Sequence, residues 1–428
     1  MDPEAILEAL DPEQRLAATS LVGPTCILAG AGTGKTRTVT HRIAYGIAKG
    51  HFAANRILAL TYTSRAAGEL RARLRSLGIP GVAVKTFHAA ALSQLEFFWP
   101  QLAGVPAPQV LTSKAKVIAE AAEEVGVRFD AALLRDIAAE IEWRKYTMRS
   151  IEQYEASVAN RPVVGSLKPE QLVAILRAYE AIKIKAQKLD WEDVLLLTLG
   201  MLQAEPRVLA HVQQQYRFFT VDEYQDISPL QQALLEAWLG DRSDLCVVGD
   251  PNQTIYSFTG ASSSNLLHFA STYPDANVIS LTRNYRSTGK IISLANRIIR
   301  GETSMEELES QGEAGVSPVF FDAQDSATEA AQVATEIKAQ LARGVKPNEI
   351  AVLYRVNSQS ELYEKALSEQ GIDYQVRGGE RFFNRPEILQ VIRLIRAEMI
   401  VPTDKPLYQI VTDAARELGW KSKSPDEG

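Results

Sequence analysis

The chain has 428 residues, of which 46% are hydrophobic and 23% are charged, and its 52 acidic and 46 basic side chains give a formal net charge of −6. A chain of this length should divide into about two or three domains, each with its own apolar core. The acidic balance excludes a wholly basic nucleic-acid coat, although it leaves room for local basic grooves.

The sequence predicts a cytoplasmic protein without a membrane segment. No apolar stretch approaches the length of a bilayer span, and the opening "MDPEAILEALDPEQ" lacks the basic start and apolar core of a signal peptide. Cys26 and Cys246 both lie in apolar runs, which favours buried free thiols over a disulfide or a metal pair.

The first recognisable motif is a glycine-rich loop between a predicted strand and a predicted helix. Residues 24–30 form a short apolar run typical of a buried parallel strand, and residues 37–50 have helical apolar spacing. Between them, "AGAGTGKT" (29–36) fits the phosphate-loop pattern G-x-x-x-x-G-K-[ST], except that alanine replaces the first glycine. The glycines let the backbone approach phosphate oxygens, Lys35 supplies a positive charge, and the Thr36 hydroxyl is placed for Mg²⁺. An ordinary glycine-rich turn is the alternative, which the strand and helix context disfavours.

Strand and helix patterns alternate along the rest of the chain. Predicted strands cover residues 56–64, 82–88, 216–223, 243–250 and 350–360. Predicted helices cover residues 65–78 and 361–371, residues 93–189 have helical patterns without a convincing strand, and residues 301–318 have the composition of an exposed loop. We therefore predict an α/β fold with a parallel sheet and a helical insertion.

Five further short motifs carry chemistry that suits a nucleotide. They are "LDPEQRLAA" (10–18), "TFHA" (86–89), "FFTVDEYQD" (218–226), "VVGDPNQTIYSFTGA" (247–261) and "LTRNYRS" (281–287). The adjacent carboxylates of Asp222 and Glu223 can divide the work of phosphate hydrolysis, one holding the magnesium shell and the other acting on the attacking water. A solvated acidic turn is the alternative for this pair.

The remaining motifs supply single candidates around the same nucleotide. Gln253 follows a predicted strand and can reach a γ-phosphate, and Gln14 can read an adenine edge. Arg286 resembles an arginine finger, and Tyr285 offers a ring that can stack on a base. An ordinary surface arginine is the alternative for Arg286.

Taken in order and spacing, these motifs resemble the UvrD/Rep/PcrA group of superfamily 1 DNA helicases. Further matching segments are "LTYTSRAAGEL", "LDWEDVL" and "AVLYRVNSQS", so the resemblance extends from the first residues to about residue 388. It implies a RecA-like phosphate-loop fold in which ATP lies between two RecA-like domains. The first domain would comprise residues 1–92 and 190–282, the helical insertion residues 93–189, and a partial second domain residues 283–428.

The resemblance also implies a set of nucleotide-binding residues. Gln14 would contact adenine and Tyr285 would stack on it, while Lys35, Thr36 and Arg37 would hold phosphates or ribose. The loop residues Gly30, Ala31, Gly32, Thr33 and Gly34 would surround the phosphates. Thr36 and Asp222 would hold Mg²⁺, Glu223 would act on water, Gln253 would sense the γ-phosphate, and Arg286 would neutralise transition-state charge.

A second implied set would bind single-stranded DNA. Tyr62, Phe87, Tyr256 and Phe258 would stack on bases, and Ser64, His88, Arg355 and Asn357 would touch the DNA backbone. Core packing is the alternative for Phe87 and Phe258. Phe258 stands where many relatives have tryptophan, and Thr259 stands where many have arginine.

The end of the chain departs from the family pattern. No segment after residue 400 resembles the late motifs that complete the second RecA-like domain, so we expect either a fragment or a naturally shortened relative. The leading hypothesis is an ATP-driven translocase that moves 3′ to 5′ on single-stranded DNA, engages DNA junctions in repair or replication, and turns over slowly on its own. A non-catalytic module that binds nucleotide and DNA is the alternative, and a small-molecule kinase is a distant third.

Overall fold

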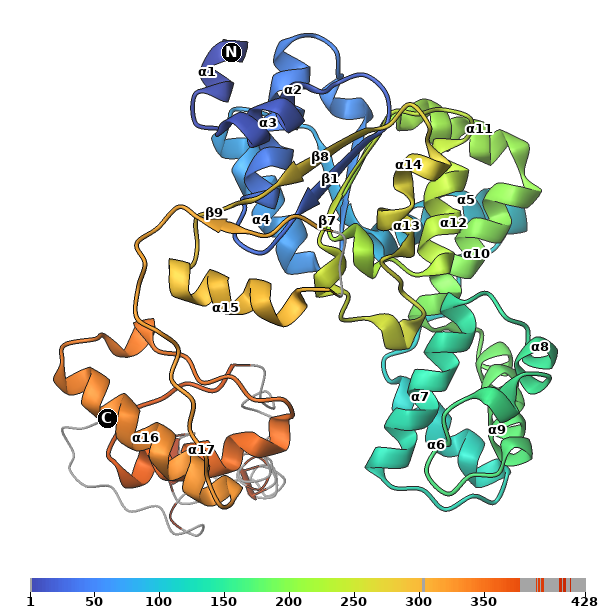
Figure 1. Cartoon of the computed structure of the whole chain (residues 1–428). Helices are drawn as coiled ribbons and strands as arrows, with labels where there is room; N and C mark the ends of the chain where they lie inside the picture. The colour runs from blue at the N-terminus through green and yellow to red at the C-terminus, as the bar shows by residue number, and fades with distance from the viewer. Residues whose placement is uncertain are drawn as a thin grey trace. The chain divides into compact units, whose positions relative to one another are not determined.

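The computed structural model describes residues 2–301 and 305–377, with a few positions between 390 and 416. The chain folds into two compact units, Met1–Pro318 and Val319–Gly428 (Figure 1). Within the described residues, no helix has both the length and the apolar character that crossing a membrane requires.

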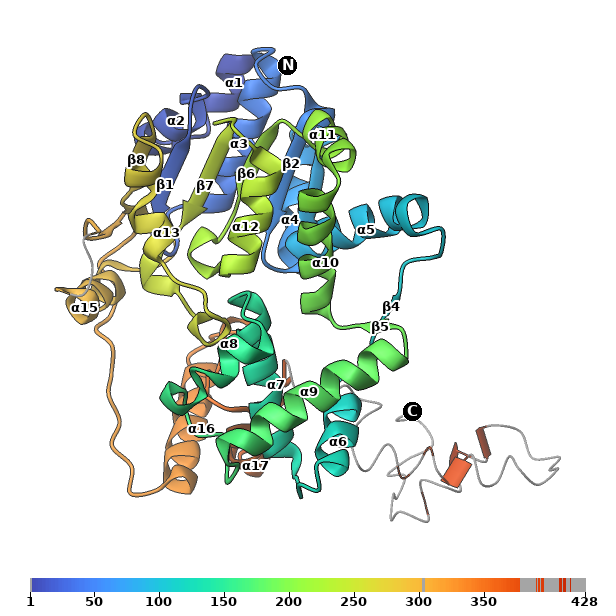
Figure 2. The ribbon, with the colours of Figure 1, turned by 90° about the vertical axis from the view of Figure 1, so that its right-hand side faces the viewer.

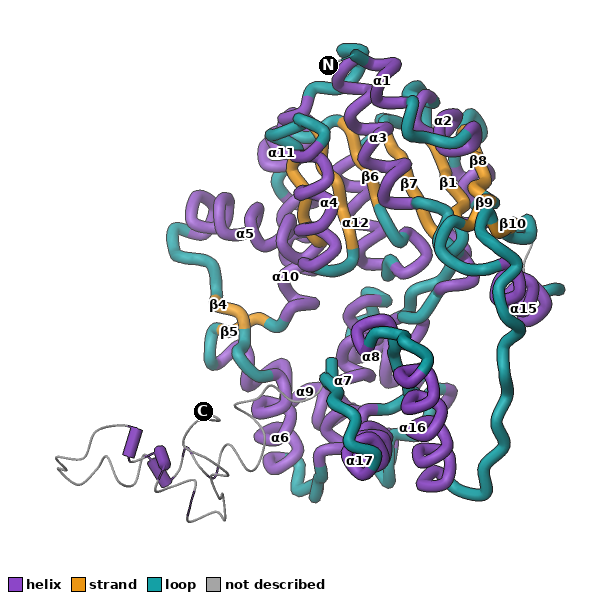
Figure 3. The backbone as a smooth tube through the Cα atoms, turned by 90° about the vertical axis from the view of Figure 1, so that its left-hand side faces the viewer, coloured by secondary structure: helices purple, strands orange, loops and turns teal. Residues whose placement is uncertain are grey.

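A six-stranded parallel sheet is the centre of the first unit. Its strands are β1 (Thr25–Ala29), β2 (Ile57–Thr61), β3 (Ala83–Thr86), β6 (Phe218–Val221), β7 (Leu245–Gly249) and β8 (Asn277–Leu281). They lie in the order β3-β2-β6-β7-β1-β8, and Figure 3 shows them side by side. All the pairs are parallel, so every carboxyl end reaches the same edge of the sheet. The predicted parallel sheet is confirmed.

Helices cover both faces of this sheet (Figure 2). One face packs on α2 (Pro12–Thr19), α3 (Lys35–Ala48) and α4 (Ser64–Ser76), and α1 (Pro3–Leu7) leans on α3. The other face packs on α5 (Phe87–Ala103), α10 (Trp191–Ala204), α11 (Pro206–Gln215) and α12 (Pro229–Leu239). The central strands are buried on both sides, which explains their nearly continuous apolar sequences. Cys26 and Cys246 are buried free thiols, as predicted.

A helical region is inserted between α5 and α10. It contains α6 (Lys114–Glu124), α7 (Ala131–Tyr146), α8 (Ile151–Glu155) and α9 (Pro169–Lys185), which share an apolar core of their own. The prediction of a region without strands was wrong, because β4 (Gln109–Val110) and β5 (Lys188–Leu189) pair in parallel where the chain enters and leaves it. Two-residue strands leave no alternating pattern for sequence analysis to detect.

Short elements complete the first unit after β7. They include α13 (Ser264–Leu267), α14 (Phe269–Thr272), α15 (Gly289–Ile299) and the strand pair β9 (Arg283–Asn284) and β10 (Glu309–Ser310). The predicted loop at 301–318 therefore contributes one short strand.

The second unit is described through α16 (Ser326–Ala342) and α17 (Ser360–Glu369). The predicted helix is confirmed, but the predicted strand at 350–360 was wrong. Residues 351–354 have no regular structure, and residues 357–359 form a 3₁₀ turn. A strand requires a neighbour to accept its backbone hydrogen bonds, and none pairs with this segment among the described residues.

A buried ionic cluster fastens the helical region to the start of α10. Lys145 on α7 lies 2.6 Å from both Asp190 and Asp193, and Lys183 on α9 lies 3.0 Å from Asp190 and 2.8 Å from Glu180. Burial acts to raise the pKa of Asp190, but the two ammonium groups lower it overall. Because both lysines and Asp190 are almost fully buried, each charge depends on its partners for solvation.

We predict that Lys145→Met destabilises the protein by about 3 kcal/mol, because it leaves buried carboxylates short of a cation. Arg177→Met is the matched control in the same region, since Arg177 pairs with Glu155 at the surface and an exposed pair contributes about 0 to 1 kcal/mol. Urea unfolding of both variants checks this, and a Lys145→Met loss no larger than that of the control would contradict it.

Candidate functional site

The glycine-rich loop has the conformation that an anion site requires. Gly32 and Gly34 have φ of 75° and 87°, in the left-handed region that glycine tolerates best. Gly34 is the N-cap of α3, which begins at Lys35. The loop therefore lies at the positive end of a 14-residue helix, where free amides and the helix dipole attract negative charge. The predicted order of strand, loop and helix is confirmed.

The acidic pair lies against the loop lysine. Asp222 and Glu223 directly follow β6, and the Lys35 Nζ is 3.3 Å from Glu223 Oε2. Glu223 has a φ of 52°, an uncommon conformation for a side-chain-bearing residue that is concentrated at functional sites. The Glu223 backbone N–H donates to Asp222 Oδ1 at 3.1 Å. The structure therefore brings Lys35 and both carboxylates together, which disfavours the alternative of a solvated acidic turn.

The donor set beside the loop fits a magnesium ion. Burial, followed by the negative charge of Glu223, raises the pKa of Asp222 to about 6, while Lys35 acts in the opposite direction. At the neighbouring strand end, the Thr61 hydroxyl is buried without a hydrogen-bond partner. Thr61 and Asp222 each follow a paired residue of β2 and β6, so they emerge at the same edge. Carboxylate and hydroxyl oxygens, including that of Thr36, are ligands suited to Mg²⁺ and its waters.

Gln225 joins the ends of two adjacent strands. Its Nε2 donates to Glu223 Oε2 at 2.9 Å, and its Oε1 accepts from the Asp250 backbone N–H at 3.0 Å. Gln253 in turn donates to Asp250 Oδ2 at 2.6 Å. Glu223 and the predicted γ-phosphate sensor are thus connected through one buried amide side chain, at Gln225.

The segment after β8 lies directly on the phosphate loop. Asn284 Nδ2 donates to the Ala31 carbonyl at 2.6 Å, and the Tyr285 backbone N–H donates to the Gly32 carbonyl at 2.9 Å. A Cβ added to Gly32 would lie 2.7 Å from the Arg286 Cβ, so Arg286 starts beside the loop. The structure brings Tyr285 and Arg286 to the loop, with the Arg286 side chain exposed, and their contacts with ATP stay predictions.

The helix that carries Gln14 supports both the loop and this segment. Gln14 is 2% exposed, and its Nε2 donates to the Thr33 carbonyl at 2.9 Å. Glu13 accepts from the backbone N–H and the hydroxyl of Thr282 at 2.7 and 2.8 Å, and Tyr285 donates its hydroxyl to Asp11 at 2.7 Å. In this structure the Gln14 amide therefore serves the loop backbone, and its contact with adenine stays a prediction.

Three aromatic side chains form a row beyond the ends of two strands. Tyr62 directly follows β2, and Tyr256 and Phe258 lie in the segment after β7. The Tyr62 and Tyr256 rings stack at 4.1 Å between centroids, and Phe258 lies 5.8 Å from Tyr256. Phe258 is 58% exposed, so the core alternative does not hold for this residue. Asp226 accepts from the backbone N–H groups of Ile255 and Tyr256, at 3.0 and 3.4 Å. The acidic motif therefore holds the segment that carries the aromatic row.

Two other predicted DNA contacts lie on a helix instead of a strand end. Phe87 and His88 begin α5, and Phe87 is 3% exposed in the main core and stacked on Trp238. The prediction that Phe87 stacks on a base was therefore wrong, and the core alternative holds. Burial, followed by the charge of Lys114, lowers the pKa of His88 to about 4, so its ring is neutral at pH 7. A neutral imidazole ring can form a hydrogen bond with a DNA phosphate but not an ion pair.

The other predicted contacts are spread over both units. Ser64 is exposed at the first turn of α4, and Arg37 is exposed in the first turn of α3. Arg355 and Asn357 are exposed in the second unit, whose contacts with DNA stay predictions.

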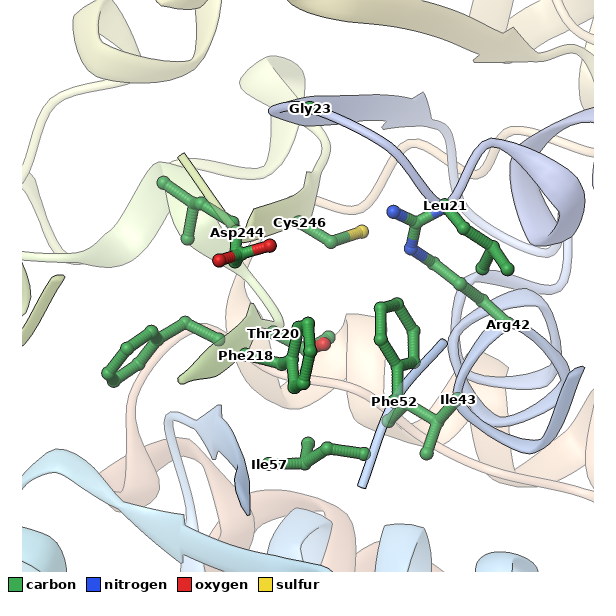
Figure 4. Close-up of a pocket in the computed structure, with 12 residues that line it drawn as sticks. Leu21, Gly23, Arg42, Ile43, Phe52, Ile57, Phe218, Thr220, Asp244 and Cys246 are labelled. Carbon is green, nitrogen blue, oxygen red and sulfur yellow. The ribbon is translucent and has the colours of Figure 1, made fainter. Parts of the chain in front are cut away.

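Figure 4 shows a cavity at the opposite edge of the sheet, by the amino ends of the strands. Its polar lining includes Arg42, whose guanidinium donates to the Ala17 and Ser20 carbonyls and to the Thr25 hydroxyl. Because Arg42 is buried and its Nη1 and Nη2 groups are used by neighbouring carbonyls and by the Thr25 hydroxyl, this cavity is structural.

Sequence analysis did not single out four residues that organise the site. They are Glu13, Gln225, Asp226 and Asn284, each inside a motif already noted. Each has a partner at least 25 positions away in the sequence. Gln225 and Asn284 also make local bonds, Gln225 to Glu223 and Asn284 with the backbone N–H groups of Arg286 and Ser287. The only signal in the sequence was that each is a polar residue within three positions of a predicted site residue.

We predict that Asp222→Asn stabilises the protein above pH 6. The pKa of Asp222 is raised from 3.8 to about 6, so stability is lost as pH rises through that window, by at most about 3 kcal/mol. Asp222→Asn does not lose stability in this way, because an amide does not ionise. Thermal unfolding should therefore show a higher melting temperature for Asp222→Asn at pH 7.5, with the difference shrinking towards pH 4.

The surface substitution Asp275→Asn is the matched control, because Asp275 is exposed at the opposite edge of the sheet. A melting temperature of Asp222→Asn that is no higher than that of wild type at pH 7.5 would contradict the prediction.

Comparison with known proteins agrees with this geometry. Residues 10–274 match the model of the UvrD/REP helicase N-terminal domain, and residues 279–424 match that of the UvrD-like helicase C-terminal domain. The chain is 46% identical over 438 residues to the ATP-dependent DNA helicase UvrD2 of Mycobacterium tuberculosis, covering 99% of this chain and 63% of that protein. It is 31% identical over 433 residues to the ATP-dependent DNA helicase PcrA of Bacillus subtilis, covering 97% of this chain and 57% of that protein. The chain thus spans about three fifths of the length of these relatives, and it belongs to the UvrD/REP helicase family.

Proposed function

We propose that the protein is an ATP-dependent DNA helicase motor that moves 3′ to 5′ along single-stranded DNA, binds DNA junctions and works in the cytoplasm. One observation carries the proposal: Lys35 of the phosphate loop lies 3.3 Å from Glu223, beside Asp222 and the start of α3. This observation supports the proposal, because a positive charge and two carboxylates that could hold a metal ion and act as a base for water lie within one small region.

The proposed roles follow from the positions of the side chains. Lys35 and the loop amides hold the terminal phosphates of ATP, and Thr36 and Asp222 hold Mg²⁺. The ion, when bound, neutralises charge on the phosphate oxygens. When phosphate takes the place of Glu223 as the partner of Lys35, the Glu223 carboxylate is free to accept a proton from water.

Gln253 and Arg286 complete the proposed reaction. Gln253 lies in the turn after β7, where its side chain is held by Asp250, so it can detect whether a γ-phosphate is present near the loop. Arg286 is exposed beside Gly32, where a guanidinium can stabilise the charge that develops on the transferred phosphoryl group. Electrostatic stabilisation of this kind is the main catalytic device in phosphoryl transfer.

The acidic motif also connects the nucleotide to the proposed DNA surface. Glu223 binds Gln225, which binds the backbone at Asp250, while Asp226 binds the backbone at Tyr256. A change in Glu223 when ATP binds or is hydrolysed is thereby linked to the segment that carries Tyr256 and Phe258. We propose that this linkage lets ATP turnover change how tightly Tyr256 and Phe258 bind DNA bases.

We predict that Glu223→Gln lowers the rate of ATP hydrolysis by about 100-fold or more while nucleotide binding persists, because an amide cannot take a proton from water. Phosphate release with and without single-stranded DNA measures turnover, and a fluorescent ATP analogue measures binding. Glu236→Gln on the surface of α12 is the matched control.

The wild-type chain distinguishes the two hypotheses in the same assay. Phosphate release that rises with single-stranded DNA supports the motor, and its absolute rate shows whether this chain turns over slowly. Nucleotide and DNA binding without any turnover would reject the motor in favour of the non-catalytic module.

We predict that Tyr256→Ala and Phe258→Ala each weaken the binding of an oligo-dT strand. The loss of one stacked base amounts to about 1 to 3 kcal/mol, or roughly five- to 150-fold in affinity. Phe97→Ala is the matched control, because Phe97 is about as exposed as Phe258 but lies on α5, beside His211 of α11. Fluorescence anisotropy checks the prediction, which fails if both variants bind as tightly as the control.

A further inference from the structure

We propose that Asn284 is a positioning residue that fixes the phosphate loop and Arg286 relative to each other. The inference rests on the proposed ATP hydrolysis and adds a residue whose side chain need not touch the nucleotide. Asn284 is 1% exposed, and both ends of its amide are used.

The donor end of this amide holds the phosphate loop. Asn284 Nδ2 donates to the Ala31 carbonyl at 2.6 Å. A Cβ added to Gly32 would lie 2.5 Å from that nitrogen, so the loop can come this close only because residue 32 is glycine. In a planar trans peptide, the carbonyl and the following N–H point in opposite directions. By fixing the Ala31 carbonyl, Asn284 also fixes the direction of the Gly32 N–H, one of the loop amides available to phosphate.

The acceptor end of the same amide holds the arginine segment. Asn284 Oδ1 accepts from the backbone N–H of Arg286 at 3.0 Å and from that of Ser287 at 2.8 Å. This is a local turn in which an asparagine side chain replaces a backbone acceptor. The turn sets the direction in which the Arg286 side chain leaves the backbone.

The backbone around Asn284 is rigid enough for this role. The Asn284 carbonyl accepts from the Gln311 N–H at 2.8 Å, and the preceding Thr282 carbonyl accepts from the Glu309 N–H at 2.9 Å. Glu13 holds the other side of Thr282. The amide of Asn284 is therefore presented from a fixed strand pair, with one end on the loop and the other on the arginine turn.

The substitution Asn284→Asp separates the two halves of this role. The introduced carboxylate has the size of the asparagine amide and still accepts from both backbone N–H groups, but when ionised it cannot donate and repels the Ala31 carbonyl. We expect Asn284→Asp to lower kcat for ATP by about tenfold or more. The Gly32 N–H would be misdirected, and the loss of one hydrogen bond to a charged phosphate in the transition state slows the reaction by roughly a factor of ten. The affinity for oligo-dT should not change.

A pH series provides a readout that a purely structural role would not move. A protonated aspartic acid can donate to the Ala31 carbonyl, so the ratio of variant to wild-type kcat should rise as pH is lowered. Asp222 is present in both proteins, so its own titration cancels in this ratio. Asn277→Asp is the matched control, because Asn277 also donates to a backbone carbonyl, that of Val22, but at the other edge of the sheet.

The possible outcomes separate this inference from the proposed function. If wild type does not hydrolyse ATP, the proposed function fails. If wild type is active and Asn284→Asp matches it in kcat and KM, or if the ratio does not change with pH, the inference fails. Should the aspartate variant not fold, Asn284→Ser replaces it, since a hydroxyl keeps the local turn but is too short to reach Ala31, and the same loss of kcat is expected.

Discussion

The ion pair between Lys35 and Glu223 joins two strands that are separated in the sequence by nearly 200 residues, and the parallel sheet makes this contact possible. In a parallel sheet all carboxyl ends reach one edge, so the residues after β1 and β6 emerge close together without special loops. The same rule places Thr61, the last residue of β2, and Gln253, which comes after β7, at that edge. The chemistry of the site thus depends on strand direction before it depends on any single side chain.

Holding several charges at one edge has an electrostatic cost, which is visible in Asp222. Its carboxyl is withdrawn from water and faces Glu223, and Lys35 only partly compensates, so its pKa rises. A nearby cation stabilises the ionised form of such a buried carboxyl group. The raised pKa of Asp222 therefore marks the place where the proposed metal–nucleotide complex would add positive charge, and Glu223, with its positive φ, belongs to the same region.

Sequence analysis found the parts of the site whose signals are local. The strand, loop and helix around Lys35 could be predicted because glycine spacing and apolar periodicity lie within about 25 residues. Phe87 shows where this approach stops. Its motif was read as a strand end, whereas Thr86 caps a helix by accepting from the Ala89 N–H, which turns Phe87 into the core.

Long-range contacts were out of reach for a different reason. Asn284 meets Ala31 across 253 positions, and no local pattern marks that pairing. Similarly, the segment at 350–354 has the apolar composition of a strand but no partner among the described residues, so composition alone was misleading.

The parallel pairing of β4 with β5 has a consequence for how this protein is built. Gln109 faces Lys188 and Val110 faces Leu189, so the chain departs for the helical region and returns from it about one strand spacing apart, near 4.8 Å. A module tethered at two adjoining points can change in size, or be exchanged for another, while the sheet keeps its register. Different members of such a lineage can therefore acquire new surfaces at this junction without rebuilding the sheet behind it.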